Sequence, residues 1–289
     1  ANTGVSAARY GSVPANPANQ NNQFSGGNPN LTPEQADTYT VGFVVTPVED
    51  LAIAVDYYAI DIEDTIATIG ASTILNFCAT TGDPFLCSRI RRNPASGDIW
   101  RSDEFYVSNL TDNFGELSVE GIDLNVSYAF EALGGRFSTN FVGNFILKEE
   151  SNPLPGVNDN ATFDCAGRIN PSCSTSEWRH IANVRYARDS WSANLRWRYF
   201  GEQEYIGTNG VPLTADTLVA AKGGIPGQSY IDLSGSLALA DNIDLTLGIN
   251  NIADKEPPLV GANNATNANA PSGYDQLGRY IFSSINVKF

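Results

Sequence analysis

The sequence predicts an antiparallel β-barrel that spans a membrane, and three observations carry this prediction. Apolar and polar residues alternate along about nine segments, as in strands with one apolar and one polar face. The links between these segments alternate between tight turns and long loops, as in outer-membrane barrels with short periplasmic turns and long extracellular loops. The last segment closes on an aromatic residue, Phe289, with no polar tail after it.

Composition and charge narrow the class of protein. The 289 residues suffice for one large all-β domain, and 42% of them are hydrophobic. No apolar run reaches the roughly 18 residues of a membrane helix, although alternating strands escape a search for such runs. Asp and Glu outnumber Lys and Arg by 32 to 17, which argues against nucleic acid as a partner. We interpret the excess of acidic residues as part of a solvated surface.

The N-terminal part of the chain has the composition of a loop. Residues 1–36 are rich in Asn, Gly, Pro, Ala and Ser and are predicted to be an extracellular loop or a disordered lead-in, and residues 37–289 form the predicted barrel part. The chain contains no methionine, and Ala1 opens neither a charged nor an apolar leader segment. We therefore expect a piece of a longer protein.

The first two predicted strands form a hairpin. Apolar residues alternate along residues 39–45 and again along residues 51–57, and the link at residues 46–50 is short enough for a tight turn. A long excursion over residues 64–113 follows. It contains one short helical possibility, residues 71–77, and a pair of cysteines.

Seven more strands are predicted after this excursion. Residues 122–130 and 137–147 are joined by a tight turn, and a second long loop over residues 149–177 carries another pair of cysteines. The strand at residues 191–199 has the sharpest alternation, with Trp, Leu and Tyr on one face and Ser, Asn and Arg on the other. The remaining predicted strands lie at residues 179–186, 231–239, 243–249 and 281–289, with long loops at 202–228 and 253–278.

The terminal strand places Ile281, Ile285, Val287 and Phe289 on one face. In a soluble protein such a strand is an unprotected edge, whereas in a barrel it is sealed against its neighbour and its apolar face meets lipid. About nine strands is an odd number, and single-chain bacterial barrels close with an even one. Because a bilayer does not tolerate raw sheet edges, we expect further strands on the N-terminal side.

Four segments resemble the C-terminal part of the TonB-dependent outer-membrane receptors. These are residues 28–42 (NPNLTPEQADTYTVG), residues 121–124 (GIDL), residues 249–257 (INNIADKEP) and residues 278–289 (GRYIFSSINVKF), in the order and spacing of that family. The resemblance covers residues 28–289. It implies the last part of a barrel of about 22 strands, without the plug domain and without the first strands.

The resemblance also implies a function. Such a receptor binds a scarce nutrient outside the Gram-negative cell and imports it across the outer membrane when the TonB complex displaces the plug. A ferric siderophore is the commonest substrate, and glycans, cobalamin and other metal chelates are alternatives. The implied partners are outer-membrane lipid, the TonB complex and, through the terminal strand, the barrel-assembly machinery. No cofactor and no enzymatic activity are implied.

Four cysteines form two close pairs inside the long loops, Cys78 with Cys87 and Cys165 with Cys173. An even number of cysteines in an exported protein favours disulfides, which would staple these loops. A zinc site needs tighter cysteine spacing or several histidines, and His180 is the single histidine. We therefore predict two disulfides and no metal site.

Three arginines, Arg185, Arg196 and Arg198, are predicted on the polar, lumen-facing side of adjacent strands. Two roles remain open for them. They pair with carboxylates of the plug or of the lumen in the full protein, or they line the path of an anionic substrate. The residues that follow them, Glu202, Glu204 and Tyr205, are further candidates for this path, at the outer mouth of the barrel.

Other constellations point to no chemistry. His180 lies near Glu177 and Asp189 in the sequence, but no nucleophile motif accompanies it, so a structural role is predicted. The acidic run at residues 61–64 lacks the spacing of an EF-hand and is interpreted as a solvated rim. A passive porin and a soluble all-β carbohydrate-binding module remain alternative functions. A porin would lack the segments at 28–42 and 249–257, and a soluble module gives no reason for the alternation of short and long links.

Overall fold

The computed structural model describes residues 5, 12–14, 16, 18, 20–152, 154–156, 162–170, 173–206, 224–259 and 273–288, without the side chains of 170 and 173. Strands dominate, and they form one large antiparallel sheet and two small ones. The chain divides into two compact units. The first comprises residues 1–37, 61–117 and 151–162, and the second comprises residues 38–60, 118–150 and 163–289.

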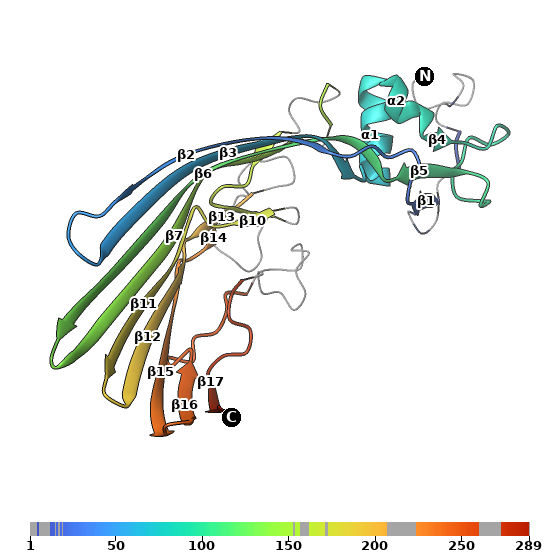
Figure 1. Ribbon diagram of the computed structural model, residues 1–289. Coiled ribbons are helices and arrows are strands. Elements are labelled where there is room, and N and C mark those ends of the chain that lie inside the picture. The colour runs from blue at the N-terminus through green and yellow to red at the C-terminus, as the bar shows by residue number, and fades with distance from the viewer. Residues whose placement is uncertain are drawn as a thin grey trace. The chain divides into compact units, whose positions relative to one another are not determined.

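The large sheet follows the order β17-β16-β15-β12-β11-β7-β6-β3-β2, with the short β8 beside β7 (Figure 1). Its strands are β2 (Gln35–Val45), β3 (Leu51–Ala67), β6 (Asp112–Ala132), β7 (Gly135–Asn152), β8 (Phe163–Asp164), β11 (Trp178–Arg188), β12 (Trp191–Phe200), β15 (Gln228–Ala240), β16 (Ile243–Asn250) and β17 (Tyr280–Val287). Each strand on the path neighbours the next one along the chain, and the nine predicted strands are confirmed. The sheet is open, with β2 and β17 at its edges.

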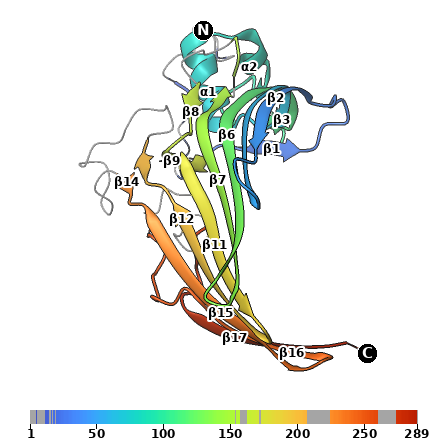
Figure 2. The ribbon, with the colours of Figure 1, turned by 60° about the vertical axis from the view of Figure 1, so that its left-hand side comes forward.

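Tight turns join alternate strand pairs, and three of these four turns contain residues with a left-handed backbone. Asp50 before β3 and Asp189 between β11 and β12 have φ of 58° and 50°, and Leu133 and Gly134 between β6 and β7 have φ of 55° and 74°. Aspartate and glycine adopt this conformation more readily than most residues. These turns match the hairpins that the sequence predicts. Strands β12, β15 and β16 pair in turn and run side by side in Figure 2.

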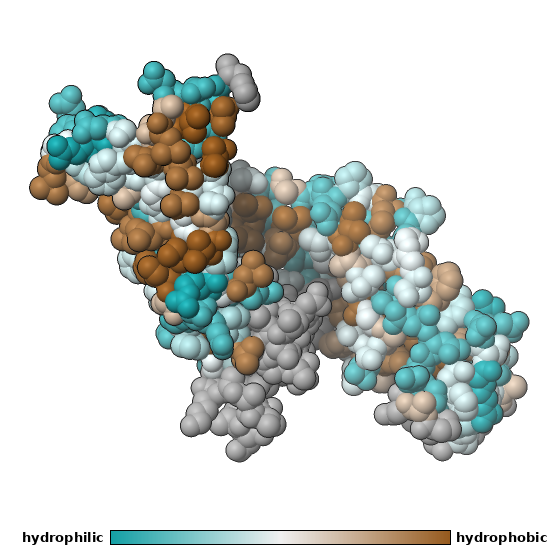
Figure 3. Space-filling model, turned by 90° about the horizontal axis from the view of Figure 1, so that it is seen from below, coloured by the Kyte–Doolittle hydropathy of each residue, from teal (hydrophilic) through white to brown (hydrophobic). Residues whose placement is uncertain are grey.

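The two faces of the sheet differ in character. Trp191, Leu195 and Trp197 of β12 lie on one face and remain 40–44% exposed. Arg196 and Arg198, on the alternate positions, lie on the other. Figure 3 shows hydrophobic residues gathered in broad patches on the surface. A large exposed apolar surface on a folded chain marks contact with a partner or a membrane, and this face has that character.

Short strands also form inside two loops of the second unit. They are β9 (Arg168–Asn170), β10 (Cys173–Thr175), β13 (Gln203–Tyr205) and β14 (Gly224–Ile225), and they make a small sheet in the order β10-β9-β13-β14. The sequence predicted only loops here. Strands of two or three residues carry too few alternating positions to be recognised from a pattern.

The first unit has a small core of its own. Helices α1 (Ala71–Thr81) and α2 (Pro84–Ser88) lie in the excursion between β3 and β6, together with β4 (Ile90–Arg91) and β5 (Tyr106–Leu110). A sheet in the order β1-β5-β4 includes β1 (Gln23–Gly26), which lies within the predicted lead-in. The buried residues of this core are Ile74, Cys78, Leu86, Ile90, Ile99, Val107 and Leu154.

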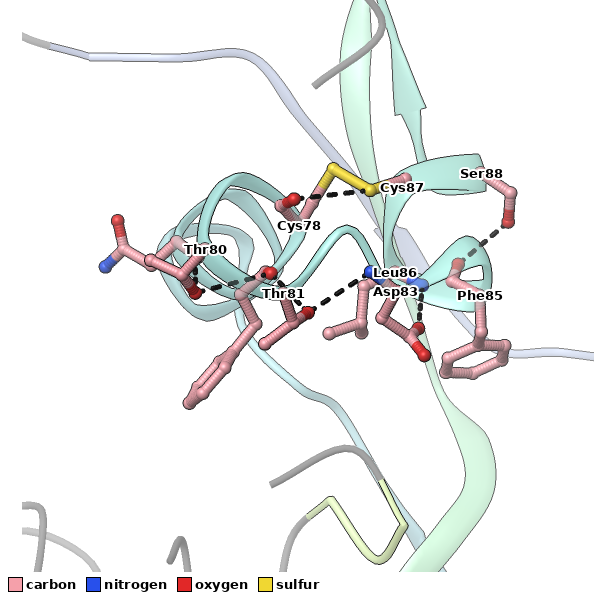
Figure 4. The surroundings of a disulfide bond; sticks show 10 residues. Cys78, Thr80, Thr81, Asp83, Phe85, Leu86, Cys87 and Ser88 are labelled. Atoms are coloured by element: carbon pink, nitrogen blue, oxygen red, sulfur yellow. Dashed lines mark hydrogen bonds between the residues drawn. A yellow bond between two sulfur atoms is a disulfide. The ribbon is translucent and has the colours of Figure 1, made fainter. Parts of the chain in front are cut away.

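The helical possibility at residues 71–77 is confirmed as α1, which continues to Thr81. The helix ends where Gly82 adopts φ 71°, and Asp83 then caps α2 by accepting a hydrogen bond from the Leu86 N–H at 2.9 Å. Figure 4 shows these contacts beside the Cys78–Cys87 disulfide, which joins the two helices. This predicted disulfide is therefore present.

Candidate functional site

A row of polar side chains crosses the polar face of the large sheet. Strand register places the members from β7 to β15 opposite one another and pairs the last two on β16 and β17. Side-chain hydrogen bonds of 3.4 Å from β12 to β16 and of 3.3 Å from β7 to β6 complete the row. From β6 to β17 the members of this polar row are Asn125, Asn140, Asn183, Arg196, Asp232, Asn250 and Tyr280. Because side chains alternate along a strand, seven polar residues at one level require seven strands in matching register.

Asp232 carries the most buried charge of this row, with its side chain 5% exposed. Its carboxylate accepts hydrogen bonds from Arg196 Nε at 2.7 Å, from Arg198 Nε and Nη2 at 3.0 Å each, and from the Asn251 N–H at 2.8 Å. A carboxylate removed from water is stable only when paired and hydrogen-bonded, and Asp232 meets both conditions. Arg196 also reaches Asn250 Oδ1 at 3.4 Å.

Arg198 connects Asp232 to a second carboxylate. Its Nη2 lies 3.0 Å from Asp275, in the loop before β17, and its guanidinium lies 5.1 Å from the ring centre of Tyr230. Two arginines and two aspartates thus neutralise one another. This arrangement accounts for Arg196 and Arg198 by the first of the two predicted roles, with carboxylates of the chain itself. Their contact with a substrate stays a prediction.

Arg185 differs from the other two predicted arginines. It lies on the same face, opposite Asn194, and is exposed, with a 3.3 Å hydrogen bond from Nη2 to Ser192 Oγ. Among the described residues no salt bridge joins it to a carboxylate. Of the three, Arg185 is therefore the cation best placed to meet an anionic group from outside the chain.

The predicted mouth residues separate into two environments. Glu202 and Glu204 line a cavity of about 570 Å³ together with Glu177 and Ile225. Tyr205, in contrast, is 6% exposed and packs in a buried cluster with Ile169, Ile225, Tyr230 and Tyr274, with Phe200 at its edge. Burial raises the pKa of the Tyr205 hydroxyl above its ordinary value. Its contact with a substrate remains a prediction.

The sequence of the chain matches that of a known protein family. The family described as "TonB dependent receptor-like, beta-barrel" matches residues 2–252. The chain belongs to this family. Its members are receptors and transporters rather than enzymes, in line with the prediction of no enzymatic activity. No curated protein matches the chain.

Solved structures share the fold of this TonB-dependent receptor barrel. A mutant of the ferric enterobactin receptor PfeA of Pseudomonas aeruginosa is 17% identical, with TM-score 0.60 over 92% of this chain and 32% of that one. The siderophore receptor PirA of Acinetobacter baumannii is 15% identical, with TM-score 0.56 over 92% and 33%. The copper transporter OprC is 16% identical, with TM-score 0.52 over 93% and 34%. The chain thus spans about a third of the length of each.

The receptor motif at residues 249–257 is a structural clamp. Asn251 is fully buried, and its side-chain amide bonds the backbone N–H and C=O of Lys255 at 2.9 Å each. Its own N–H reaches Asp232. Asp254 accepts a 2.8 Å hydrogen bond from the N–H of Arg279, the residue before β17. The motif therefore joins the polar row to the terminal strand.

The terminal strand has the predicted faces. Ile281, Ile285 and Val287 pair in register with Ile249, Leu245 and Ile243 of β16 and are 40–77% exposed. Phe289 lies outside the described residues. The predicted disulfide between Cys165 and Cys173 also falls partly outside the described residues. Cys165 is disulfide-bonded, but the side chain of Cys173 is not described.

His180 belongs to an aromatic cluster on the apolar face, which the sequence analysis did not foresee. The ring is 8% exposed, lies 4.3 Å from the ring centre of Trp197 and accepts a 2.9 Å hydrogen bond from Trp178 Nε1 at Nδ1. Phe141 and Tyr199 also stack on it. Its role is packing, as predicted from the lack of a nucleophile motif. These rings meet because the register of adjacent strands places them side by side.

Within the described residues, no group of three or more His, Cys, Asp or Glu side chains is arranged to hold a metal ion. In the same part of the chain, no helix is long and apolar enough to cross a membrane.

Proposed function

We propose that the whole protein is an active transporter of the Gram-negative outer membrane whose substrate is a ferric siderophore. The family match over residues 2–252 carries this proposal. The names of two similar structures support the substrate, since one is a ferric enterobactin receptor and another a siderophore receptor. A passive porin, the main alternative, gives no reason for the clamp motif that ties the terminal strand to the polar row.

The two faces of the sheet have different roles in this proposal. The apolar face meets outer-membrane lipid, where a charge at mid-depth would cost about 2–4 kcal/mol, and the polar face lines the lumen. Arg196 and Arg198 hold the wall through Asp232 and Asp275. Arg185 meets carboxylate or catecholate oxygens of the passing siderophore, and Glu202 and Glu204 shape the outer mouth.

The rest of the machinery lies outside the chain. The open edges of β2 and β17 pair with further strands, which complete a barrel of about 22 strands in which residues 37–289 are the C-terminal part. A plug domain fills the lumen and engages the TonB complex. The terminal strand, through Ile281, Ile285, Val287 and Phe289, presents the segment that the barrel-assembly machinery takes up.

The proposal is tested by iron uptake into cells that produce the whole protein. We expect uptake of iron-55 from at least one of a catecholate, a hydroxamate and a carboxylate siderophore, and loss of this uptake in cells without TonB. Arg185→Gln should lower the uptake, whereas Arg136→Gln should not, because Arg136 is already within 3.5–3.6 Å of Asp50 and Glu131. Uptake that persists without TonB would show a passive channel, and no uptake of any of the three would refute the siderophore.

A further inference from the structure

The polar face of the large sheet carries an apolar patch that its polar pattern does not explain. Val142 of β7 and Ile181 of β11 lie opposite one another in the strand register, on the face that carries Arg198. They are 46% and 44% exposed. Apolar side chains that gather beside a few polar ones are a feature of surfaces that bind small molecules.

A cavity of about 410 Å³ lies at this patch. On the polar face its lining forms two rows of residues that the register pairs across β7, β11 and β12, namely Asn144, Arg179 and Phe200 in one row and Val142, Ile181 and Arg198 in the other. Arg179 is the second residue of β11 and Phe200 is the last of β12, so the cavity lies at the end of these strands from which the long loops leave. In an outer-membrane barrel this end is the extracellular one.

Arg179 brings an unpaired positive charge to the cavity. Its side chain is exposed, and among the described residues it forms no salt bridge and no side-chain hydrogen bond. The other cation of the lining, Arg198, is neutralised by Asp232 and Asp275. A guanidinium offers N–H donors in a planar fork that fits a pair of anionic oxygens. The charge of the lining therefore favours an anion.

Asn144 is a fixed polar wall beside Arg179. Its Nδ2 donates to the Tyr58 hydroxyl at 3.0 Å and to Asp123 Oδ1 at 2.8 Å, so both amide protons are engaged. Asp123 is not part of the lining. It lies on β6, two strands from β11 in the order of the sheet and thus roughly 10 Å from Arg179. An anion in the cavity therefore depends on Arg179 for its donors.

The apolar part of the cavity has the shape of a shelf. Val142 and Ile181 are β-branched and stiff, and neighbouring strands lie about 4.8 Å apart, so the two side chains form a firm surface about as broad as an aromatic ring. Phe200 borders this shelf. Its ring is held by Tyr274, with the ring centres 5.0 Å apart, and offers an edge to a further ring.

We propose that this cavity is an aryl-anion site, which binds an aromatic ring that carries an anionic oxygen. The ring lies on Val142 and Ile181 beside Phe200, and the oxygen accepts hydrogen bonds from Arg179. The source of the ligand rests on the proposed function, because in a siderophore the group with this chemistry is an aromatic arm, a catecholate or phenolate. A hydroxamate or an aliphatic carboxylate has no ring to cover the shelf.

The first test is saturation-transfer NMR on the whole protein in detergent, with protein-free micelles as the blank. Benzoate offers a ring and a charge, benzamide the ring alone and acetate the charge alone. We expect a dissociation constant of about 1 mM for benzoate and binding at least about 10-fold weaker for the other two. Arg179→Gln should weaken benzoate binding about 10-fold and leave benzamide within about twofold. Arg188→Gln is the matched control, because Arg188 ends the same strand far from the cavity and pairs with Asp189 at 3.3 Å.

A second variant tests the shelf. Ile181→Thr keeps a β-branched residue at an exposed position, so the sheet should stay intact while benzoate binding weakens about 3-fold. Val184→Thr is its control, since Val184 is 40% exposed and pairs with Leu195 on the other face of the sheet. The inference is overturned if acetate binds as tightly as benzoate, or if a variant and its control have equal effects. It is also overturned if no probe shows saturable binding, which is the result expected if the plug covers the shelf.

Iron uptake separates this inference from the proposed function. Uptake from a catecholate siderophore that Arg179→Gln lowers supports both. TonB-dependent uptake from the hydroxamate or the carboxylate siderophore alone would overturn the aryl-anion site and keep the transporter. Saturable binding of benzoate without uptake from any of the three siderophores would keep the site and refute the siderophore.

Discussion

Substitution of Asp232 by Asn should destabilise the sheet more than any other change of a single charge on its polar face. The carboxylate accepts four hydrogen bonds, three of them from Arg196 and Arg198, and its side chain is 5% exposed. Asn keeps the size and one carbonyl oxygen but removes the negative charge. Both guanidinium groups then lose their shared partner.

The cost of this change is bounded by the exposure of the two arginines. Removal of one partner from a buried ion pair costs about 3–5 kcal/mol. Arg196 is 40% exposed and can be hydrated, and Arg198 keeps Asp275 at 3.0 Å, so we expect the lower end, about 3 kcal/mol. The free energy of unfolding is measured by urea titration in lipid vesicles, with tryptophan fluorescence as the signal, since Trp191 and Trp197 flank the site on β12.

Asp244→Asn is the matched control. Asp244 pairs with Lys288 at 3.5 Å, and the two side chains are 39% and 67% exposed. An exposed pair of this kind contributes less than about 1 kcal/mol. Equal midpoints for the wild type and Asp232→Asn, or equal losses for Asp232→Asn and Asp244→Asn, would refute the idea that Asp232 holds β12, β15 and the loop before β17 together.

Three further outcomes follow from contacts elsewhere in the chain. Replacement of both Cys78 and Cys87 by Ser should cost the first unit about 2.7 kcal/mol, from the closure entropy of a short loop, and should speed proteolysis between residues 71 and 110. Gly143→Ala should cost about 1–3 kcal/mol and alter tryptophan fluorescence, because a Cβ there would lie 2.4 Å from the Trp178 ring. Burial raises the pKa of Tyr274 to about 12, so stability should fall as the pH rises from about 10, where the unfolded chain begins to lose this proton, and Tyr274→Phe should remove that part of the fall.

Each of these outcomes has its own check. Proteolysis should quicken in the first unit only, and equal cleavage of the large sheet would contradict a local role for the disulfide. Gly27→Ala is the control for Gly143→Ala, because no heavy atom lies within 4 Å of its added Cβ. For Tyr274, urea titrations at pH 9, 10 and 11 compare the wild type with Tyr274→Phe. An identical pH slope in the two proteins would contradict the assignment.

The strands of the large sheet could be predicted from the sequence because alternation is a local signal. Residues 191–199 were expected to put Arg196 and Arg198 on one face, and the register of β12 with β11 and β15 agrees. The disulfide of Cys78 with Cys87 was likewise predicted from spacing within one loop. In both cases the evidence lies within a few residues of the feature itself.

The partners of the arginines could not be predicted in the same way. Asp275 comes from a loop 77 residues after Arg198, and no periodicity indicates that they meet. In the sequence, Asp232 is only one of several polar residues that alternate with apolar residues along its strand. Its position directly opposite Arg196 depends on the register of β12 with β15, which tertiary packing decides. The burial of Tyr205 depends on the small sheet of the loops, whose strands are too short to leave a pattern.

The neutral cluster of Arg196, Arg198, Asp232 and Asp275 has an electrical consequence for the polar face. Two positive and two negative groups, held within about 3 Å of their partners, act at a distance as opposed dipoles rather than as fixed charges. The electric field of this neutral cluster falls off steeply with distance, so added salt changes it little. This part of the polar face therefore holds no deep electrostatic well for an ion, whereas Arg185, which forms no salt bridge among the described residues, keeps its positive field.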